Sequence, residues 1–223
     1  MRSRPKTPSG FLRLQPPAEA GEKLPEKKRL RERLRMYDVR PRKRWGQNFL
    51  IREQIAERIV DSSQITDDQV VVEIGPGTGA LTGYLGARAR KVIAVEKDRR
   101  LAALLSDELG DWSRIQILQA DFLQIDLHAL AIEEDAEKLT IVGNLPYSIT
   151  TPIISRLIES RSVLDSALVL VQREYAHRLA AAAGTSDYGS LTVYARFYTT
   201  LEPVFHVPPS AFWPKPEVES TLV

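Results

Sequence analysis

The chain has 223 residues, of which 43% are hydrophobic, and a formal net charge of +2. This length suits one α/β domain with a small appendage and allows a substantial hydrophobic core. The absence of cysteine excludes disulfides and thiolate metal sites, and the three histidines lie far apart without ligand spacing, so we expect no bound metal. No apolar run approaches the roughly 18 residues of a membrane span, and the N-terminus lacks a signal-peptide core. We therefore predict a soluble cytoplasmic protein without membrane partners.

The charge is distributed unevenly along the chain. Residues 1–44 contain 15 Lys and Arg against 5 Asp and Glu, a net +10, whereas the remainder contains 16 against 24, a net −8. Such a basic run is either a solvated tail or a segment attracted to phosphates. We predict a basic, flexible N-terminal arm over residues 1–40. The cations next to the following domain are expected to contact RNA, and these are Arg40, Arg42, Lys43 and Arg44.

The rest of the chain alternates between strand and helix patterns, which predicts a catalytic domain over residues 41–223 with a doubly wound, mostly parallel sheet. The predicted strands cover 69–74, 91–96, 115–119, a run ending at 144, and 167–172. The predicted helices cover 51–60, a segment through 81 and 85, 101–109, 151–159, 174–182 and 191–197. Residues 127–137 fit either a helix or a loop, and residues 183–188 a loop. Two late segments, 202–207 and 218–223, are expected to complete the sheet, with the last strand antiparallel.

A glycine-rich turn follows the first buried strand at Gly75-Pro76-Gly77-Thr78-Gly79. Glycines at this place let the backbone turn tightly and approach a ligand closely. Glu96 lies 21 residues beyond Gly75, at the end of the second strand, where a carboxylate can bind ribose hydroxyls. The pattern indicates a nucleoside cofactor but does not separate NAD from S-adenosylmethionine (SAM).

Asp121 and Phe122 end the third strand. The acid can accept a hydrogen bond from an adenine amino group while the aromatic ring packs on the base. The alternative is a loop-capping Asp beside a core Phe. Because the carboxyl ends of parallel strands meet at one edge of a sheet, these residues and the glycine turn together predict a pocket for an adenosyl group.

The sequence Asn144-Leu145-Pro146-Tyr147 follows the buried run 139–143. Alone it is a β-turn signal. At the end of a fourth strand, the Asn144 amide oxygen and the Leu145 or Pro146 carbonyl can hold the amino hydrogens of an adenine, with its lone pair toward an electrophile. Tyr147 can stack on the base. Together with the adenosyl pocket, this motif favours SAM over NAD as the cofactor.

The motifs resemble those of the KsgA-type small-subunit (16S) rRNA adenine N6,N6-dimethyltransferase family. The resemblance runs from about Arg42 to the last residue, and its motifs are Trp45–Leu50, Glu73–Gly79, Glu96, Asp121–Phe122, Asn144–Tyr147 and Phe212–Ser220. It implies a Rossmann-like, SAM-dependent methyltransferase that dimethylates two adjacent adenines in the 3′-terminal hairpin loop of 16S rRNA. The implied partner is the small ribosomal subunit precursor, and we expect a monomer. The family's small helical C-terminal domain should begin near residue 223, so we expect it to be largely absent.

The resemblance also implies a role for each matching residue. The residues implied in cofactor binding are Asn48, Leu50, Gly75, Gly77, Glu96, Asp121, Phe122 and Asn144. Those implied in catalysis are Asn144, Leu145, Pro146 and Tyr147. Tyr147 and Phe212 are expected to sandwich the flipped adenine. For Phe49 we accept simple core packing, but not for Phe212, whose loop is restricted by prolines.

Three other functions stay open. The first is the related macrolide-resistance type of 23S rRNA adenine N6-methyltransferase, although Gly46–Leu50 and Glu73–Gly77 look more like the small-subunit enzymes. The second is a non-catalytic RNA-binding assembly or transcription factor on the same fold, which the intact Asn144–Tyr147 motif disfavours. The third is an NAD-dependent oxidoreductase.

Overall fold

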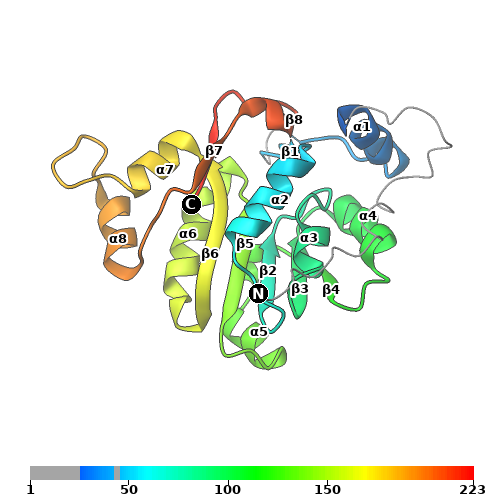
Figure 1. Cartoon of the computed structure of the whole chain (residues 1–223), viewed down its shortest axis with the longest axis horizontal. Coiled ribbons are helices and arrows are strands. Elements are labelled where there is room, and N and C mark those ends of the chain that lie inside the picture. The colour runs from blue at the N-terminus through cyan, green and yellow to red at the C-terminus, as the bar shows by residue number, and fades with distance from the viewer. Residues whose placement is uncertain (1–25, 43–45) are drawn as a thin grey trace, which may run out of the picture.

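The computed structural model describes residues 26–42 and 46–223. Its centre is a seven-stranded sheet in the order β4-β3-β2-β5-β6-β9-β7 (Figure 1). The strands are β2 (Val70–Ile74), β3 (Lys91–Glu96), β4 (Ile115–Gln119), β5 (Leu139–Asn144), β6 (Leu164–Gln172), β7 (Phe205–Val207) and β9 (Ser220–Leu222). The first five strands of this order are parallel, and β9 runs antiparallel to both β6 and β7. The predicted mostly parallel sheet with an antiparallel last strand is thus confirmed.

The central strand β2 determines where a ligand can bind. All five of its residues are buried, as expected for a parallel strand covered on both faces. It pairs with β3 on one side and β5 on the other, with Ile74 opposite both Val95 and Gly143. In chain order, β3 and β4 are added on one side of β2, and β5 and β6 are then added on its other side. This reversal leaves a crevice at the carboxyl ends of β2 and β5.

Helices cover both faces of the sheet. One face carries α2 (Glu53–Ser62), α3 (Thr82–Gly86) and α4 (Arg99–Leu109), whose apolar side chains join one core cluster. The other face carries α5 (Leu127–Glu133), α6 (Thr150–Glu159), α7 (Arg173–Leu179) and α8 (Ser190–Tyr198), whose side chains join a second cluster. Within the described residues, short 3₁₀ turns connect these elements, namely η3 (Phe122–Gln124), η4 (Tyr147–Ile149), η5 (Arg161–Val163) and η6 (Pro209–Ala211). None of the helices in the described ranges is long and apolar enough to cross a membrane.

Residues 26–40 differ from the predicted flexible arm. They contain the helix α1 (Glu26–Met36), and Leu30, Leu34 and Val39 are buried in the core cluster of α2–α4. The two leucines lie four residues apart and so share one face of the helix. Because many Lys and Arg residues surround the two leucines, the sequence pattern predicted a solvated tail and not a docked helix. The first 25 residues of the predicted arm lie outside the described part of the chain.

A second, two-stranded sheet connects distant parts of the sequence. Strand β1 (Phe49–Leu50) pairs antiparallel with β8 (Phe212–Trp213), so that Leu50 lies opposite Phe212. The Ile51 amide continues the connection by donating to the Ala211 carbonyl at 2.8 Å. This sheet places the segment before α2 across the carboxyl ends of the central strands.

Candidate functional site: a cavity at the carboxyl edge of the sheet

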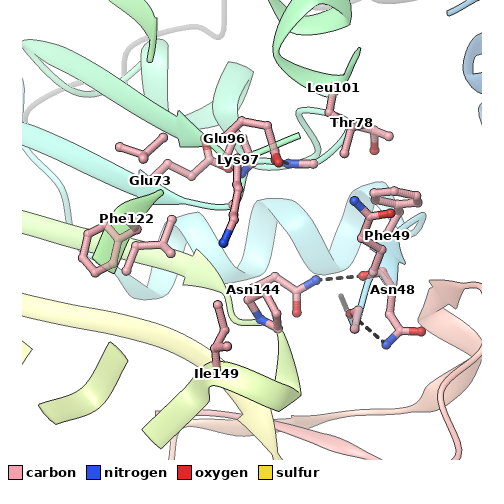
Figure 2. Close-up of a pocket in the computed structure, with 18 of the residues that line it drawn as sticks. Asn48, Phe49, Glu73, Thr78, Glu96, Lys97, Leu101, Phe122, Asn144 and Ile149 are labelled. Atoms are coloured by element: carbon pink, nitrogen blue, oxygen red, sulfur yellow. Dashed lines mark hydrogen bonds between the residues drawn. The ribbon is translucent and has the colours of Figure 1, made fainter. Parts of the chain in front are cut away.

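An open cavity with about 1160 Å³ of empty space, part of it continuous with solvent, lies at the carboxyl ends of β2, β3, β4 and β5 (Figure 2). The segment before α2 forms another wall. The predicted site residues that line the cavity are Asn48, Leu50, Gly75, Gly77, Glu96, Asp121, Phe122, Asn144 and Pro146. The structure therefore brings together nine positions that are distributed over almost 100 residues of sequence.

The glycine turn needs glycine for two reasons. Gly75, Gly77 and Gly79 all have positive φ angles, of 62°, 59° and 79°, which residues with a Cβ rarely adopt. A Cβ on Gly77 would also lie only 3.1 Å from the Phe49 ring. The turn is tied to β3, because the Gly75 amide donates to the Val95 carbonyl at 3.0 Å. It thus presents bare backbone to the cavity.

Two buried carboxyl groups line the cavity next to this turn. Glu96 is 6% exposed, and its oxygens accept from the amides of Gly77 at 3.0 Å and Asp98 at 2.8 Å. Burial raises the pKa of Glu96 to about 7, although these two hydrogen bonds favour the ionised form. Glu73 is 1% exposed, and burial raises its pKa to about 8. Its Oε2 is buried and has no hydrogen-bond partner among the described residues.

Asp121 closes the cavity at the end of β4. Its Oδ1 accepts from the Leu123 amide at 3.1 Å, which makes Asp121 the N-cap of η3, and its Oδ2 lies 2.7 Å from the Lys97 ammonium. The hydrogen bond from Lys97 lowers the pKa of Asp121, so the carboxylate is an acceptor at neutral pH. Figure 2 shows Lys97 extending from the end of β3 into the cavity. Phe122 is buried at the same end.

The side chain of Asn144 has a defined orientation at the end of β5. Its Nδ2 donates to the backbone carbonyl of Asn48 at 3.0 Å (Figure 2). Because a carbonyl can only accept, the amide nitrogen must face Asn48, and the amide oxygen is left for another donor. The backbone just before Asn144 is packed closely against β2, since a Cβ on Gly143 would lie 2.9 Å from the Ile74 carbonyl oxygen. An oriented hydrogen-bond acceptor therefore faces the cavity.

The three residues after Asn144 have different surroundings. Leu145 is buried in the core, and its amide donates to the Leu170 carbonyl at 3.0 Å. Pro146 lines the cavity, but its carbonyl already accepts from the Ile149 amide at 3.1 Å and the Thr150 hydroxyl at 3.2 Å. Tyr147 is half-buried and does not line the cavity, and its hydroxyl lies 2.7 Å from the Ser220 hydroxyl, so its predicted contact with the adenine stays a prediction.

Phe49 and Phe212 differ in their relation to the cavity. Phe49 is buried, as the core interpretation predicts, but its ring also forms part of the cavity wall. Phe212 is 3% exposed and belongs to the core without lining the cavity, because pairing of β8 with β1 turns it inward. A buried ring that does not line the cavity offers no face to a base there. The predicted sandwich of the adenine by Phe212 thus requires the segment around β8 to move, and it stays a prediction.

The structure describes two of the four residues that are predicted to contact RNA. Arg40 is exposed, and Arg42 is half-buried with its backbone amide bonded to the Gln47 side chain at 2.8 Å. Lys43 and Arg44 lie outside the described residues. The role of all four in RNA binding stays a prediction.

The sequence predicts no role for two of the charged residues that line the cavity, Glu73 and Lys97. Glu73 belongs to the motif Glu73–Gly79, and a charged residue inside an otherwise apolar buried strand is itself a signal of function. Lys97 follows the predicted ribose acid directly, and its contact with Asp121 spans 24 residues of sequence. Among the described residues, no group of three or more His, Asp or Glu side chains is arranged to hold a metal ion.

Comparison with known proteins agrees with this geometry. A family model described as ribosomal RNA adenine dimethylase matches residues 39–223. The chain is 44% identical to the ribosomal RNA small subunit methyltransferase A of Anoxybacillus flavithermus over 87% of this chain and 67% of that protein. It therefore spans about two thirds of that relative's length.

Two solved structures are also similar. A dimethyladenosine transferase from Plasmodium falciparum superposes with a TM-score of 0.69 and 28% identity, covering 78% of this chain and 61% of the other. The 23S rRNA methyltransferase ErmE superposes with a TM-score of 0.65 and 32% identity, covering 78% and 68%. The extent of the family match and the identity to relatives establish that the chain is a member of the ribosomal RNA adenine dimethylase family.

Proposed function

We propose that this chain transfers methyl groups from SAM to N6 of two adjacent adenines in the 3′-terminal hairpin loop of 16S rRNA. The observation that carries the proposal is the oriented amide oxygen of Asn144, which faces the same cavity as the glycine turn and the buried acids. A SAM site and an acceptor for an adenine amino group thus share one space. Membership in the family favours this activity over NAD-dependent redox chemistry.

The donor is held by the walls of the cavity. The bare backbone of Gly75 and Gly77 admits the methionine part of SAM, since no Cβ intrudes there. Glu96 accepts from the ribose hydroxyls, and Asp121 accepts from the adenine amino group with Phe122 packed against the ring. When bound, SAM supplies a methyl group attached to a sulfonium sulfur. When that carbon–sulfur bond breaks, the rest of SAM leaves as a neutral thioether.

The acceptor adenine is oriented by the end of β5. The Asn144 amide oxygen takes one amino hydrogen, and we assign the other to the Leu145 carbonyl, because the Pro146 carbonyl already accepts two hydrogen bonds. Both bonds direct the N6 lone pair toward the donor. The new N–C bond forms as the C–S bond breaks, and the amino group then releases a proton. Positioning and electrostatics do most of this catalysis.

The substrate nucleotide must leave its base stack to reach this cavity. Tyr147 lies between two residues that line the cavity, Pro146 and Ser148, and we assign it to stacking on the flipped base, a contact worth roughly 1–3 kcal/mol. Dimethylation requires that the pocket admit the monomethylated base a second time. We assign the chemistry to residues 41–223 and place the enzyme in the cytoplasm, acting as a monomer on the small ribosomal subunit precursor.

One alternative substrate is supported by a specific observation. The similarity to ErmE at 32% identity leaves an adenine of 23S rRNA as a second candidate. The donor site and the transfer step are the same in both cases. Mapping the modified nucleotide on each rRNA separates the two.

The role of Asn144 is tested by Asn144→Ala. We expect methylation of small-subunit particles to fall by at least about a hundredfold, because a preorganised polar contact to the reacting group is lost. Binding of S-adenosylhomocysteine (SAH), measured by calorimetry, should be retained and weaken far less than methylation, because Asn144 is one of several residues that line the cavity. Methyl transfer from tritiated SAM at the wild-type rate would reject the assignment.

A further inference from the structure

The helix α1 lies outside the family match, which begins at residue 39, yet it contacts Thr78, which lines the cavity proposed to hold the methyl donor. Arg33 on α1 is 16% exposed. Its Nη2 donates to the Thr78 carbonyl at 3.1 Å, and its Nε donates to Glu108 Oε1 at 3.1 Å. The same Nη2 also bonds Glu108 Oε2. One guanidinium thus joins α1, the glycine turn and the end of α4.

Thr78 belongs to the glycine turn and lines the cavity. The turn is held from one side by bonds to β3, from the Gly75 amide to the Val95 carbonyl and from the Gly77 amide to Glu96. Arg33 holds it from the side of α1. A turn rich in glycine has many accessible backbone conformations. A bond from a fixed side chain therefore selects the conformation that leaves the cavity open.

The position of Arg33 is fixed by how α1 is docked. Leu30 and Leu34 are buried in the core, and Arg33, three residues after Leu30, lies at the edge of the same docked face of the helix. Beyond the helix, Asp38 accepts from Arg100 at the start of α4 at 3.1 Å. Figure 1 shows α1 beside α4. The helix is thus attached near both ends of α4, and Arg33 reaches the turn from a rigid support.

We propose that Arg33 is a positioning residue for the methyl donor. It acts through Thr78, keeping the glycine turn in the shape that accepts SAM, and it makes no contact with the donor itself. This inference rests on the proposed function, which supplies the identity of the donor. It gives part of the basic N-terminal region a role in donor binding.

The test compares two methionine substitutions on the same helix. Arg33→Met removes the bonds to Thr78 and Glu108, whereas Arg29→Met removes a bond to Glu53 of 3.3 Å that does not involve the glycine turn. Both variants lose one positive charge and one ion pair of α1. We expect the Kd for SAH of the Arg33→Met variant to rise about tenfold, corresponding to about 1.4 kcal/mol. The KM for SAM should rise in parallel, with kcat unchanged, and Arg29→Met should leave both near wild type.

A purely structural role for α1 predicts a different result. Equal losses of SAH affinity in both variants, or none in a folded Arg33→Met protein, would overturn the proposal. Should Arg33→Met fail to fold, Arg33→Lys replaces it, because a single ammonium cannot reproduce the two-pronged contact with Glu108 and Thr78. That variant should also bind SAH more weakly, and wild-type affinity would again overturn the proposal. Lack of SAH binding by the wild-type chain would instead reject the proposed function.

Discussion

At the scale of single residues, the site depends on how backbone atoms orient a few side chains. Asn144 takes its orientation from the carbonyl of Asn48, which lies 96 positions earlier in the chain. Glu96 takes its position from two backbone amides. The bonds with the Asn48 carbonyl and the Asp98 amide use backbone atoms that any residue type could supply, whereas the Gly77 amide is presented by a turn that needs glycine. The chemistry therefore relies on the correct fold of the segment before α2 as much as on the motif residues.

The raised pKa of Glu96 predicts pH-dependent binding of the donor. Ribose hydroxyls donate to the carboxylate, so SAH binds better to the ionised form, which becomes dominant above a pH of about 7. The Kd for SAH should therefore fall as the pH rises from 6 to 8, with one proton released per binding event at the lower end. Asp121 stays ionised over this range, because its pKa lies below the ordinary value. Calorimetry in buffers of different ionisation enthalpy measures both quantities.

Glu96→Gln is the matched control for this prediction, because it has the same shape and no titration near pH 7. It should bind SAH more weakly, with a smaller change between pH 6 and 8. A pH dependence as steep as that of the wild type would assign the effect to another group, of which Glu73 in the same cavity is the first candidate.

Single residues also show what could be predicted from sequence. The residues at strand ends were predicted correctly as neighbours of one cavity, because parallel strands bring their carboxyl ends to the same edge. The burial of Phe212 was not predicted, since it results from pairing with Leu50 across 162 positions of sequence. Arg33 and Lys97 were missed for the same reason. Their partners are determined by tertiary structure and leave no local pattern.

At the scale of elements, strands were predicted better than the N-terminal helix. The predicted bounds of β3 and β4 match the structure, because each is an apolar run between clear turn signals. Helix α1 was missed because the many cations around Leu30 and Leu34 resembled a solvated tail. Only docking against α4 reveals that its apolar face is buried.

The packing of α1 gives a direct prediction for stability. Leu34 is 2% exposed, so Leu34→Ala should lower the free energy of unfolding by roughly 2–5 kcal/mol through lost burial and a cavity. Met36→Ala on the same helix is the control, because Met36 is 72% exposed, and its effect should stay within about 0.5 kcal/mol. Denaturant titration of the two variants measures the difference. Equal, small effects would mean that α1 is not docked in solution.

At the scale of the whole molecule, the order of strands determines where the two substrates meet. The reversal at β2 opens one crevice, and the sheet of β1 and β8 brings two distant segments across it. The doubly wound class followed from the alternation of strands and helices. The position of the reversal at β2 could not be predicted in this way, because neither periodicity nor composition specifies which strands are neighbours in the sheet. The basic N-terminal region next to an acidic remainder predicts attraction to an RNA phosphate backbone, and this role stays a prediction.

The central claim is that this chain dimethylates adenines of small-subunit rRNA. The most direct test incubates the full chain with SAM and with small-subunit or large-subunit particles that lack adenine dimethylation. Mass spectrometry of RNA fragments then locates the product. The account predicts N6,N6-dimethyladenine at two adjacent positions near the 3′ end of 16S rRNA and none in 23S rRNA. Methylation confined to 23S rRNA, or no methylation by a chain that binds SAH, would contradict it.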